Sequence, residues 1–213
     1  MKSSLIRPAL ALALAAGLAG CGGSDKAEFV VKGTISGIVY PGAVLTTNGM
    51  DLPIAPPAKA GDPVSFAFPN KLEYGDVYNV VFKAEPDNQF CSTPSQAIPN
   101  FNDTAGRLAE INITYACGID AYQIGGKVSG LTADGLVLAN GSTGGTVAVA
   151  KPAAGVTTPI DFGFEAFVPY DSSYGVTVLT QPTGQFCTVA NGTGIMKAAT
   201  VSNIAVTCGP VVN

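Results

Sequence analysis

The chain has 213 residues and a formal net charge of −4, and it contains no histidine. Its 11 lysines and arginines are scattered singly, whereas nucleic-acid binding needs clustered positive charge, so no nucleic-acid partner is expected. Without histidine, a Ser–His–Asp triad is impossible and the commonest zinc ligand is missing. The 26 glycines and 15 prolines indicate short strands joined by many turns.

The N-terminus has the pattern of an export signal. Lys2 and Arg7 precede an alanine- and leucine-rich run over 9–19, which has the length of a signal-peptide core and is too short to span a bilayer. The run ends in Leu-Ala-Gly-Cys at 18–21, which resembles the lipobox of bacterial lipoproteins. The resemblance implies cleavage after residue 20 and a lipid on Cys21. The alternative is an ordinary secretory signal with an incidental cysteine.

Residues 1–20 are therefore expected to be a signal peptide and residues 21–27 a tether, whose Gly-Gly-Ser start is typical of a flexible linker. No later apolar run is long enough to span a bilayer, so the expected membrane contact is the lipid anchor on Cys21. Glycine rather than aspartate follows this cysteine, which in enteric bacteria favours the outer membrane. We expect a lipid-anchored protein of the bacterial cell envelope, either facing the periplasm or exposed at the surface.

Alternating apolar residues predict β-strands after the tether. The alternation is clear over 64–68 and again over 78–82, and the Asn-Gly pair at 48–49 favours a tight hairpin turn. No stretch beyond residue 29 has a helical period. In chain order, the expected elements are strands over 29–39 with a glycine kink, 44–52 around the hairpin turn, 64–68, 78–82 and 108–117, and loops over 53–63 and 94–104.

The second half of the chain repeats the first. The matching segments are 126–130 with 33–37, 174–187 with 78–91, and 203–209 with 112–118. We therefore expect one domain over 28–118 and a second over 122–213. The linker between them, 119–121, is so short that the domains should touch or hold a restricted angle.

Each repeat offers about seven short strands in roughly 90 residues, a pattern typical of an immunoglobulin-like sandwich. The predicted fold is all-β: two tandem immunoglobulin-like β-sandwiches, with one disulfide each, after an N-terminal lipoprotein signal peptide. The expected core residues alternate along the strands with outward-facing positions. They are Val80, Phe82 and Ile113 in the first domain, and Val176, Val178 and Ile204 in the second.

Besides Cys21, the chain has four cysteines, two in each repeat and at matching places. An exported protein folds in an oxidising compartment, so disulfides are expected, and four cysteines allow three pairings. The repeat selects Cys91–Cys117 and Cys187–Cys208, because each domain then closes on itself. Loops of this size correspond to roughly 3 kcal/mol each in the chain-entropy model. A metal site is the alternative, but two separated pairs without histidine disfavour it.

The second repeat also resembles a known kind of module. Residues 125–131, 174–178, 181–187 and 206–208 are similar to a repeat found singly or in tandem in exported proteobacterial lipoproteins and surface proteins. The first repeat is more divergent, with Glu-Pro-Asp-Asn at 85–88 in place of Gln-Pro-Thr-Gly. The resemblance implies an exported β-sandwich module and brings no catalytic residues with it.

Few residues offer catalytic chemistry. Two nearby carboxylates could act as a glycosidase pair, and a lysine could activate a serine, but no spacing supports either arrangement. The candidates are the pairs Asp161 with Glu165 and Glu73 with Asp76, and the lysines Lys151 and Lys197. We expect them to be solvated edge or loop residues, and we predict no catalytic residue and no cofactor.

Ligand-binding candidates are also few. The oxygen-bearing pairs at 87–88 and 102–103 lack the spaced acidic loop of a calcium site, so no metal is predicted. Exposed tyrosines could stack on sugars, with Tyr74, Tyr170 and Tyr174 as candidates. Because Tyr170 and Tyr174 have counterparts in the first repeat, we expect them to be core or corner residues.

The leading hypothesis is a non-enzymatic cell-envelope lipoprotein that acts as a structural, adhesive or partner-binding module, with a protein or polysaccharide as its partner. The alternative is a periplasmic assembly accessory or inhibitor that binds another envelope protein. A hydrolase is the third possibility. An exposed apolar patch would favour the binding functions, and a pocket with converging carboxylates would favour the enzyme.

Overall fold

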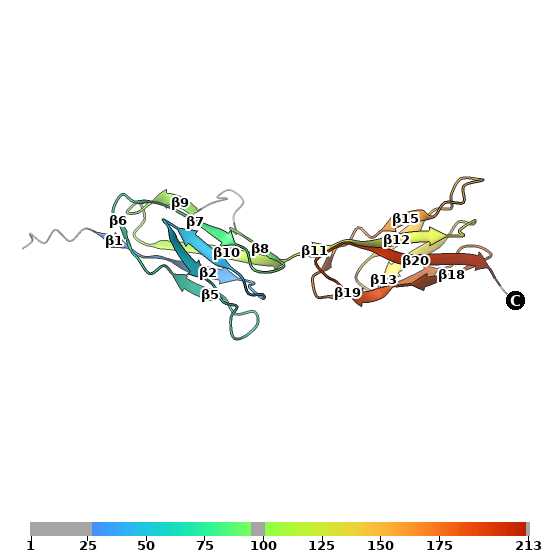
Figure 1. Ribbon diagram of the computed structural model, residues 1–213, viewed down its shortest axis with the longest axis horizontal. Coiled ribbons are helices and arrows are strands. Elements are labelled where there is room, and N and C mark those ends of the chain that lie inside the picture. Colours follow the sequence, from blue (N-terminus) through green and yellow to red (C-terminus); the bar gives the residue numbers. More distant parts are fainter. Residues whose placement is uncertain (1–26, 95–100, 212–213) are drawn as a thin grey trace, which may run out of the picture.

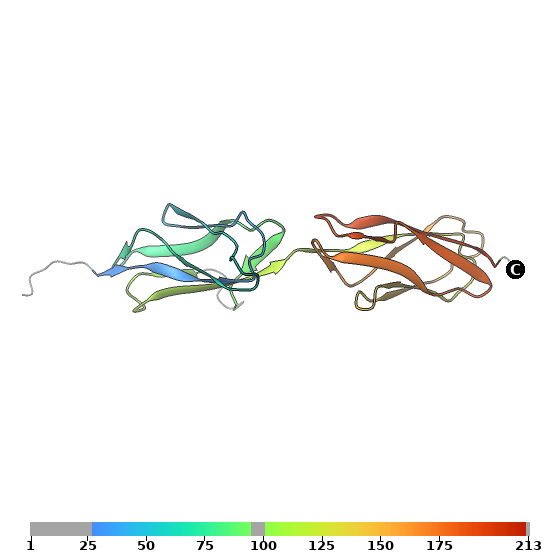
Figure 2. The same ribbon diagram turned by 90° about the horizontal axis from the view of Figure 1, so that it is seen from below.

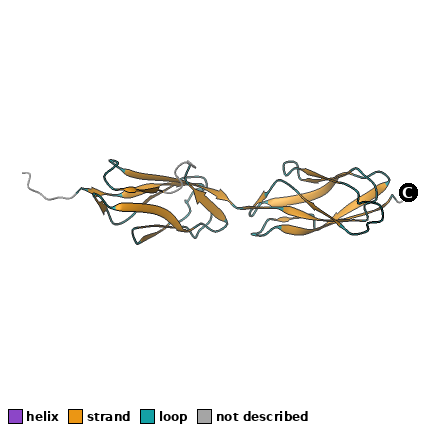
Figure 3. Ribbon diagram, turned by 90° about the horizontal axis from the view of Figure 1, so that it is seen from above, coloured by secondary structure: helices purple, strands orange, loops and turns teal. Residues whose placement is uncertain are grey.

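The computed structural model describes residues 27–94 and 101–211, and strands are the regular elements throughout these ranges (Figures 1 and 3). They form two β-sandwiches that lie end to end in both perpendicular views (Figures 1 and 2). The predicted all-β fold with two tandem sandwiches is therefore confirmed. Among the described residues, no helix has the length and hydropathy needed to cross a membrane. The expected signal peptide and Cys21 lie outside the described ranges.

The first domain has two four-stranded sheets, with strand orders β5-β2-β10-β8 and β4-β3-β7-β9, and a short β1-β6 pair. Its strands are β1 (Glu28–Phe29), β2 (Val31–Ser36), β3 (Val44–Thr47), β4 (Met50–Pro53), β5 (Val64–Ala67), β6 (Leu72–Glu73), β7 (Val77–Ala84), β8 (Gln89–Ser92), β9 (Phe101–Thr104) and β10 (Ile111–Ile119).

The second domain repeats this topology, with orders β15-β12-β20-β18 and β14-β13-β17-β19 and a β11-β16 pair. Its strands are β11 (Ala121–Tyr122), β12 (Ile124–Ser129), β13 (Leu136–Asn140), β14 (Thr146–Val149), β15 (Ile160–Gly163), β16 (Val168–Pro169), β17 (Ser173–Thr180), β18 (Gln185–Ala190), β19 (Thr193–Ile195) and β20 (Val201–Pro210). The repeat seen in the sequence is thus a repeat of the fold.

In one sheet of each domain the two central strands run parallel: β2 pairs with β10, and β12 pairs with β20. Immunoglobulin constant domains use a different strand order within the same sandwich architecture. Glycines allow the close approach of these strands. A Cβ atom at Gly33 would lie 2.0 Å from the carbonyl oxygen of Ile113, and one at Gly126 would lie 1.8 Å from that of Ile204.

Some predicted strand limits were wrong. The first long strand ends at Ser36 rather than at residue 39, because Gly37 leaves the extended conformation with a φ of 79°. The last strand of the first domain begins at Ile111 rather than at residue 108, and the expected loop over 94–104 contains β9. The hairpin turn is as predicted, since Asn48 and Gly49 both have positive φ between β3 and β4.

Each domain encloses its own hydrophobic core. Four of the six predicted core residues, Val80, Ile113, Val176 and Ile204, are at most 2% exposed. Phe82 and Val178 are partly buried and pack against the cores of their domains. The alternation of apolar residues therefore correctly predicted which side chains of these strands point into the core.

Candidate functional site

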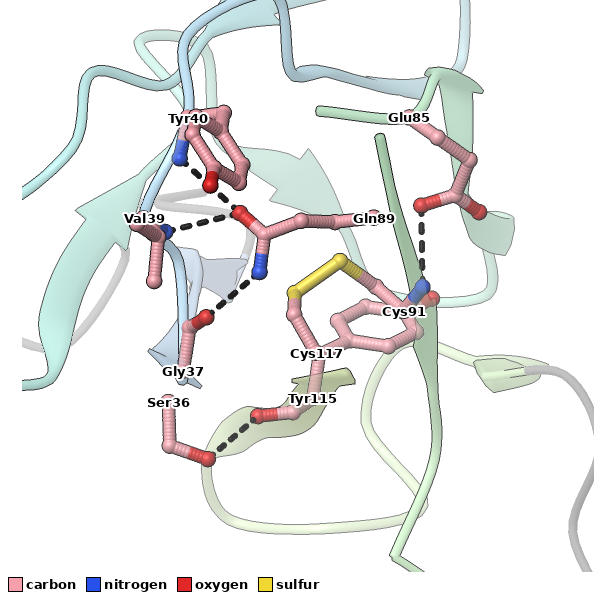
Figure 4. The surroundings of a disulfide bond; sticks show 9 residues. All are labelled: Ser36, Gly37, Val39, Tyr40, Glu85, Gln89, Cys91, Tyr115 and Cys117. Atoms are coloured by element: carbon pink, nitrogen blue, oxygen red, sulfur yellow. Dashed lines mark hydrogen bonds between the residues drawn. A yellow bond between two sulfur atoms is a disulfide. The ribbon is translucent and has the colours of Figure 1, made fainter. Parts of the chain in front are cut away.

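The repeated Gln-Phe-Cys motif lies on a sheet-edge strand, β8 in the first domain and β18 in the second. Its glutamine points inward. Gln89 is 3% exposed, and its Oε1 accepts hydrogen bonds from the backbone N–H groups of Val39 (2.7 Å) and Tyr40 (2.9 Å). Its Nε2 donates to the carbonyl oxygen of Gly37 at 2.7 Å (Figure 4). Gln89 therefore holds the loop after β2 against β8.

Gln185 makes the same three contacts in the second domain. Its Oε1 accepts from the backbone N–H groups of Thr132 (2.8 Å) and Ala133 (3.0 Å), and its Nε2 donates to the carbonyl oxygen of Gly130 (2.8 Å). The repetition of this glutamine was visible in the sequence. Its role was missed, because the partners lie 52 to 55 residues away along the chain.

The cysteine of the motif joins the edge strand to its neighbour. Cys91 is disulfide-bonded to Cys117, with a Cα–Cα distance of 3.9 Å, across the antiparallel pair β8–β10. Cys187 is bonded to Cys208 in the same way across β18–β20, at 4.0 Å. Both predicted pairings are confirmed, and each domain contains one disulfide between neighbouring strands of the same sheet.

A side chain from the preceding turn covers the free edge beside each disulfide. Gln181 accepts a hydrogen bond from the backbone N–H of Cys187 (2.7 Å) and donates one to the carbonyl oxygen of the same residue (3.1 Å). Glu85 makes only the first of these contacts, accepting a hydrogen bond from the N–H of Cys91 (3.1 Å). The pKa of Glu85 is raised overall. Burial is the largest cause, the hydrogen bond from Cys91 lowers the pKa, and the nearby Asp120 raises it. Because open strand edges invite pairing with other chains, this side chain protects the edge, more completely in the second domain.

The phenylalanine of the motif points outward in both domains. Phe90 is 57% exposed and Phe186 is 56% exposed. Phe90 stands opposite Gly118 on β10, and its ring would lie 3.2 Å from a Cβ atom there. Phe186 stands opposite Gly209, which has no atom within 4 Å of its Cβ position. The two domains thus present the same exposed aromatic side chain on the same sheet edge.

A single residue connects the two domains. The backbone N–H of Asp120 donates to the carbonyl oxygen of Asn88 in the first domain (2.9 Å), and its own carbonyl oxygen accepts from the N–H of Tyr170 in the second (2.8 Å). The ring of Tyr40 meets the ring of Tyr170 edge to face, with centroids 5.5 Å apart. The domains therefore touch, as the short linker predicted.

The structure does not bring the carboxylate candidates together at a pocket. Asp161 forms an exposed ion pair with Lys127 (2.6 Å). The depression of about 350 Å³ beside it has no second carboxylate among its lining residues, and Glu165 is exposed outside it. In the other pair, the carboxylate of Asp76 accepts the backbone N–H of Glu73 (2.8 Å) and so shapes a turn. Neither pair has the setting of a glycosidase.

The lysine and calcium candidates have structural contacts. Lys151 forms an ion pair with Asp134 (3.2 Å), and Lys197 is exposed. Asp103 accepts hydrogen bonds from Arg107 (3.1 Å) and from the backbone N–H of the next residue (2.8 Å). In the ranges that the structure describes, no three metal-ligating side chains gather into a cluster that could hold an ion.

The three candidate tyrosines have different surroundings. Tyr174 packs against the second core, and Tyr170 is half-buried at the domain junction. Tyr74, which occupies the same place as Tyr170 in the first domain, is 71% exposed at the far end of that domain. The expectation of a corner position therefore fits Tyr170, whereas Tyr74 is a surface residue.

No family model matches this chain, and no curated protein matches it. Among solved structures, a mutant of the shaft pilin SpaA from Lactobacillus rhamnosus GG matches with 13% identity, over 87% of this chain and 100% of that one, at a TM-score of 0.28. The major pilin protein of Streptococcus pyogenes matches with 10% identity, over 87% and 98% of the two chains, also at 0.28. At these values the likeness gives no information about the function of this chain.

Proposed function

We propose that the protein is a non-enzymatic, lipid-anchored module of the bacterial envelope that holds its second domain away from the membrane and presents it to a partner. The observation that carries the proposal is the end-to-end arrangement, with the chain entering at β1 and leaving at the opposite end after β20 (Figures 1 and 2). Because β20 has 10 residues, each sandwich is roughly 33 Å long, at about 3.3 Å per strand residue. Two in line would span roughly 70 Å.

The crosslinks support an exported location. Each domain has its own disulfide, which joins two neighbouring strands of that domain. Disulfides are expected in a protein that folds in an oxidising compartment. The exposed Phe90 and Phe186 recur at the same position of each domain, and this repeated apolar contact point is the feature that supports a binding role. The ion-paired and turn-forming states of the carboxylate candidates support a function without catalysis.

The lipid anchor is tested by the substitution Cys21→Ser. We expect the wild-type protein in the membrane fraction with an acylated N-terminal peptide, and the variant without acyl groups. A wild-type N-terminal peptide that carries no acyl groups would contradict the anchor. A hydrolase activity of the purified protein that disappears in Asp161→Asn would contradict the non-enzymatic function.

Protease accessibility distinguishes the two binding functions. Digestion on intact cells would support a surface module that meets a protein or polysaccharide outside the cell. Protection until the outer membrane is permeabilised would favour the alternative, a periplasmic accessory or inhibitor that binds another envelope protein. Crosslinking in cells would then identify the envelope complex.

A further inference from the structure

The end of the first domain at which the chain enters carries an exposed apolar patch. Tyr74 is 71% exposed, Val77 63% and Leu108 56%, and we call these three residues the entry-pole patch. Two backbone hydrogen bonds, from Gly75 to Ala105 (3.0 Å) and from Ala105 to Asp76 (2.8 Å), hold the two loops that carry it together. The backbone segments that carry these three residues are therefore held together at this end of the domain.

Tyr74 is exposed where its counterpart is in contact. In the second domain, Tyr170 at the same position packs edge to face on Tyr40 of the first domain. The Tyr74 ring lies over Gly106, close enough that a Cβ atom built on this glycine would be 2.3 Å from the ring. Within the described ranges, Tyr74 has no neighbour from another domain. The fold thus places a contact residue at this pole and leaves its outer face open.

The chain from the expected anchor arrives at this residue. The backbone N–H of Tyr74 donates to the carbonyl oxygen of Ala27, at 3.1 Å. Six residue steps separate Ala27 from Cys21, so a fully extended tether reaches at most about 20 Å. A domain of about 100 residues has a radius of gyration of about 13 Å and is wider than that gap. A lipid surface is therefore the occupant that the tether places opposite the patch.

The charges around the patch indicate which lipids fit. Lys71 is paired with Glu28 (2.7 Å), and Arg107 is paired with Asp103 (3.1 Å). Two more carboxylates, those of Glu73 and Asp76, lie close to Tyr74 in the sequence. Within the described ranges, the basic side chains beside the patch are therefore paired, whereas tyrosine and leucine side chains suit the zwitterionic interface, where one end of the ring is apolar and the other is wet.

We propose that the entry-pole patch rests on the headgroup region of the bilayer and so orients the two domains outward from the membrane. This contact deepens the proposed function and rests on the lipid anchor at Cys21. Tyr74 and Leu108 enter the interface, and the junction at Asp120 directs the second domain away from it.

The chain contains no tryptophan, so Tyr74→Trp would introduce a single fluorescent probe into the patch. The chain from Cys21 onward would be coupled through the Cys21 thiol to a maleimide lipid in phosphatidylcholine vesicles brominated near the headgroup. The other four cysteines are in disulfides and do not react. Phe186→Trp, at a 56% exposed position in the second domain, is the matched control.

We expect the bromolipids to quench the Tyr74→Trp protein at least twofold more strongly than the Phe186→Trp protein. Leu108→Trp is a second probe in case the first variant does not fold. Equal quenching of the patch and control variants would overturn the contact. Because maleimide coupling supplies the anchor chemically, this measurement is independent of native acylation, so a failed contact can be told apart from a failure of the proposed lipid anchor.

Discussion

Gln89→Ala is the substitution that most directly tests how the repeated motif stabilises a domain. The side chain is 3% exposed and makes three hydrogen bonds to the loop after β2, at 2.7, 2.9 and 2.7 Å. Alanine removes all three and leaves the N–H groups of Val39 and Tyr40 and the carbonyl group of Gly37 without this partner. The loop would then no longer be fixed to β8.

The magnitude follows from the three bonds. A net hydrogen bond contributes about 0.5–1.5 kcal/mol, which gives about 1.5–4.5 kcal/mol for the three bonds. Water can reach part of the freed backbone, because Val39 is exposed and Tyr40 is half-buried, so the lower half of this range is expected. The loss falls on the first domain alone, because the second domain has its own glutamine, Gln185.

Urea unfolding of the full chain, followed by tyrosine fluorescence and far-UV circular dichroism, would measure this loss. Phe90→Ala is the matched control, since it changes the next residue, which is exposed, and should cost less than about 1 kcal/mol. Gln185→Ala should lower the stability of the second domain by a similar amount to that lost from the first in Gln89→Ala. A change below about 0.5 kcal/mol in Gln89→Ala would refute the stabilising role of the three bonds.

Three further substitutions test the edge, the parallel strands and the junction. Burial places the pKa of Glu85 in the folded state above its value in the unfolded state. The first domain therefore loses stability as the pH rises through the interval between these two pKa values and Glu85 becomes charged. Glu85→Gln should therefore stabilise the first domain at pH 7 in urea titrations, and the gain should shrink as the pH falls through the range in which Glu85 is protonated. Gly126→Ala should cost about 3 kcal/mol, because its Cβ would lie 1.8 Å from a backbone oxygen, whereas Gly209→Ala should be neutral by thermal unfolding. Tyr40→Ala should leave both domains folded but widen the distribution of interdomain angles in small-angle scattering, and an unchanged distribution would contradict the aromatic contact.

The sequence was sufficient to predict the sandwiches and their crosslinks. Alternation shows which face of a strand is inward, and the repeat restricts the cysteine pairings, because Cys91 and Cys117 recur as a unit. Alternation does not show which strands are neighbours. The parallel pairing of β2 with β10 was therefore not predicted, although the glycine at residue 33 was the signal for it, since a Cβ atom there would lie 2.0 Å from the carbonyl oxygen of Ile113.

The contact residues were harder to predict, because their partners are set by the tertiary structure. Gln89 was noticed as part of a repeated motif, but its hydrogen bonds connect segments about 50 residues apart. Tyr40 has no counterpart in the second repeat, where Ala133 occupies its place, so the repeat itself concealed it. The side chains that join the domains were found only in the three-dimensional arrangement.

The two domain entrances show how one repeated turn can serve two surroundings. In both domains the entry-turn tyrosine donates its backbone N–H to the incoming chain, Tyr74 to Ala27 (3.1 Å) and Tyr170 to Asp120 (2.8 Å). This hydrogen bond places the tyrosine at the end of the domain where the chain enters, next to the group that precedes the domain. For Tyr170 that group is the first domain, and the ring packs on Tyr40. For Tyr74 it is the proposed tether from Cys21, so under this proposal the same geometry that joins one domain to the next seats the first domain on the membrane.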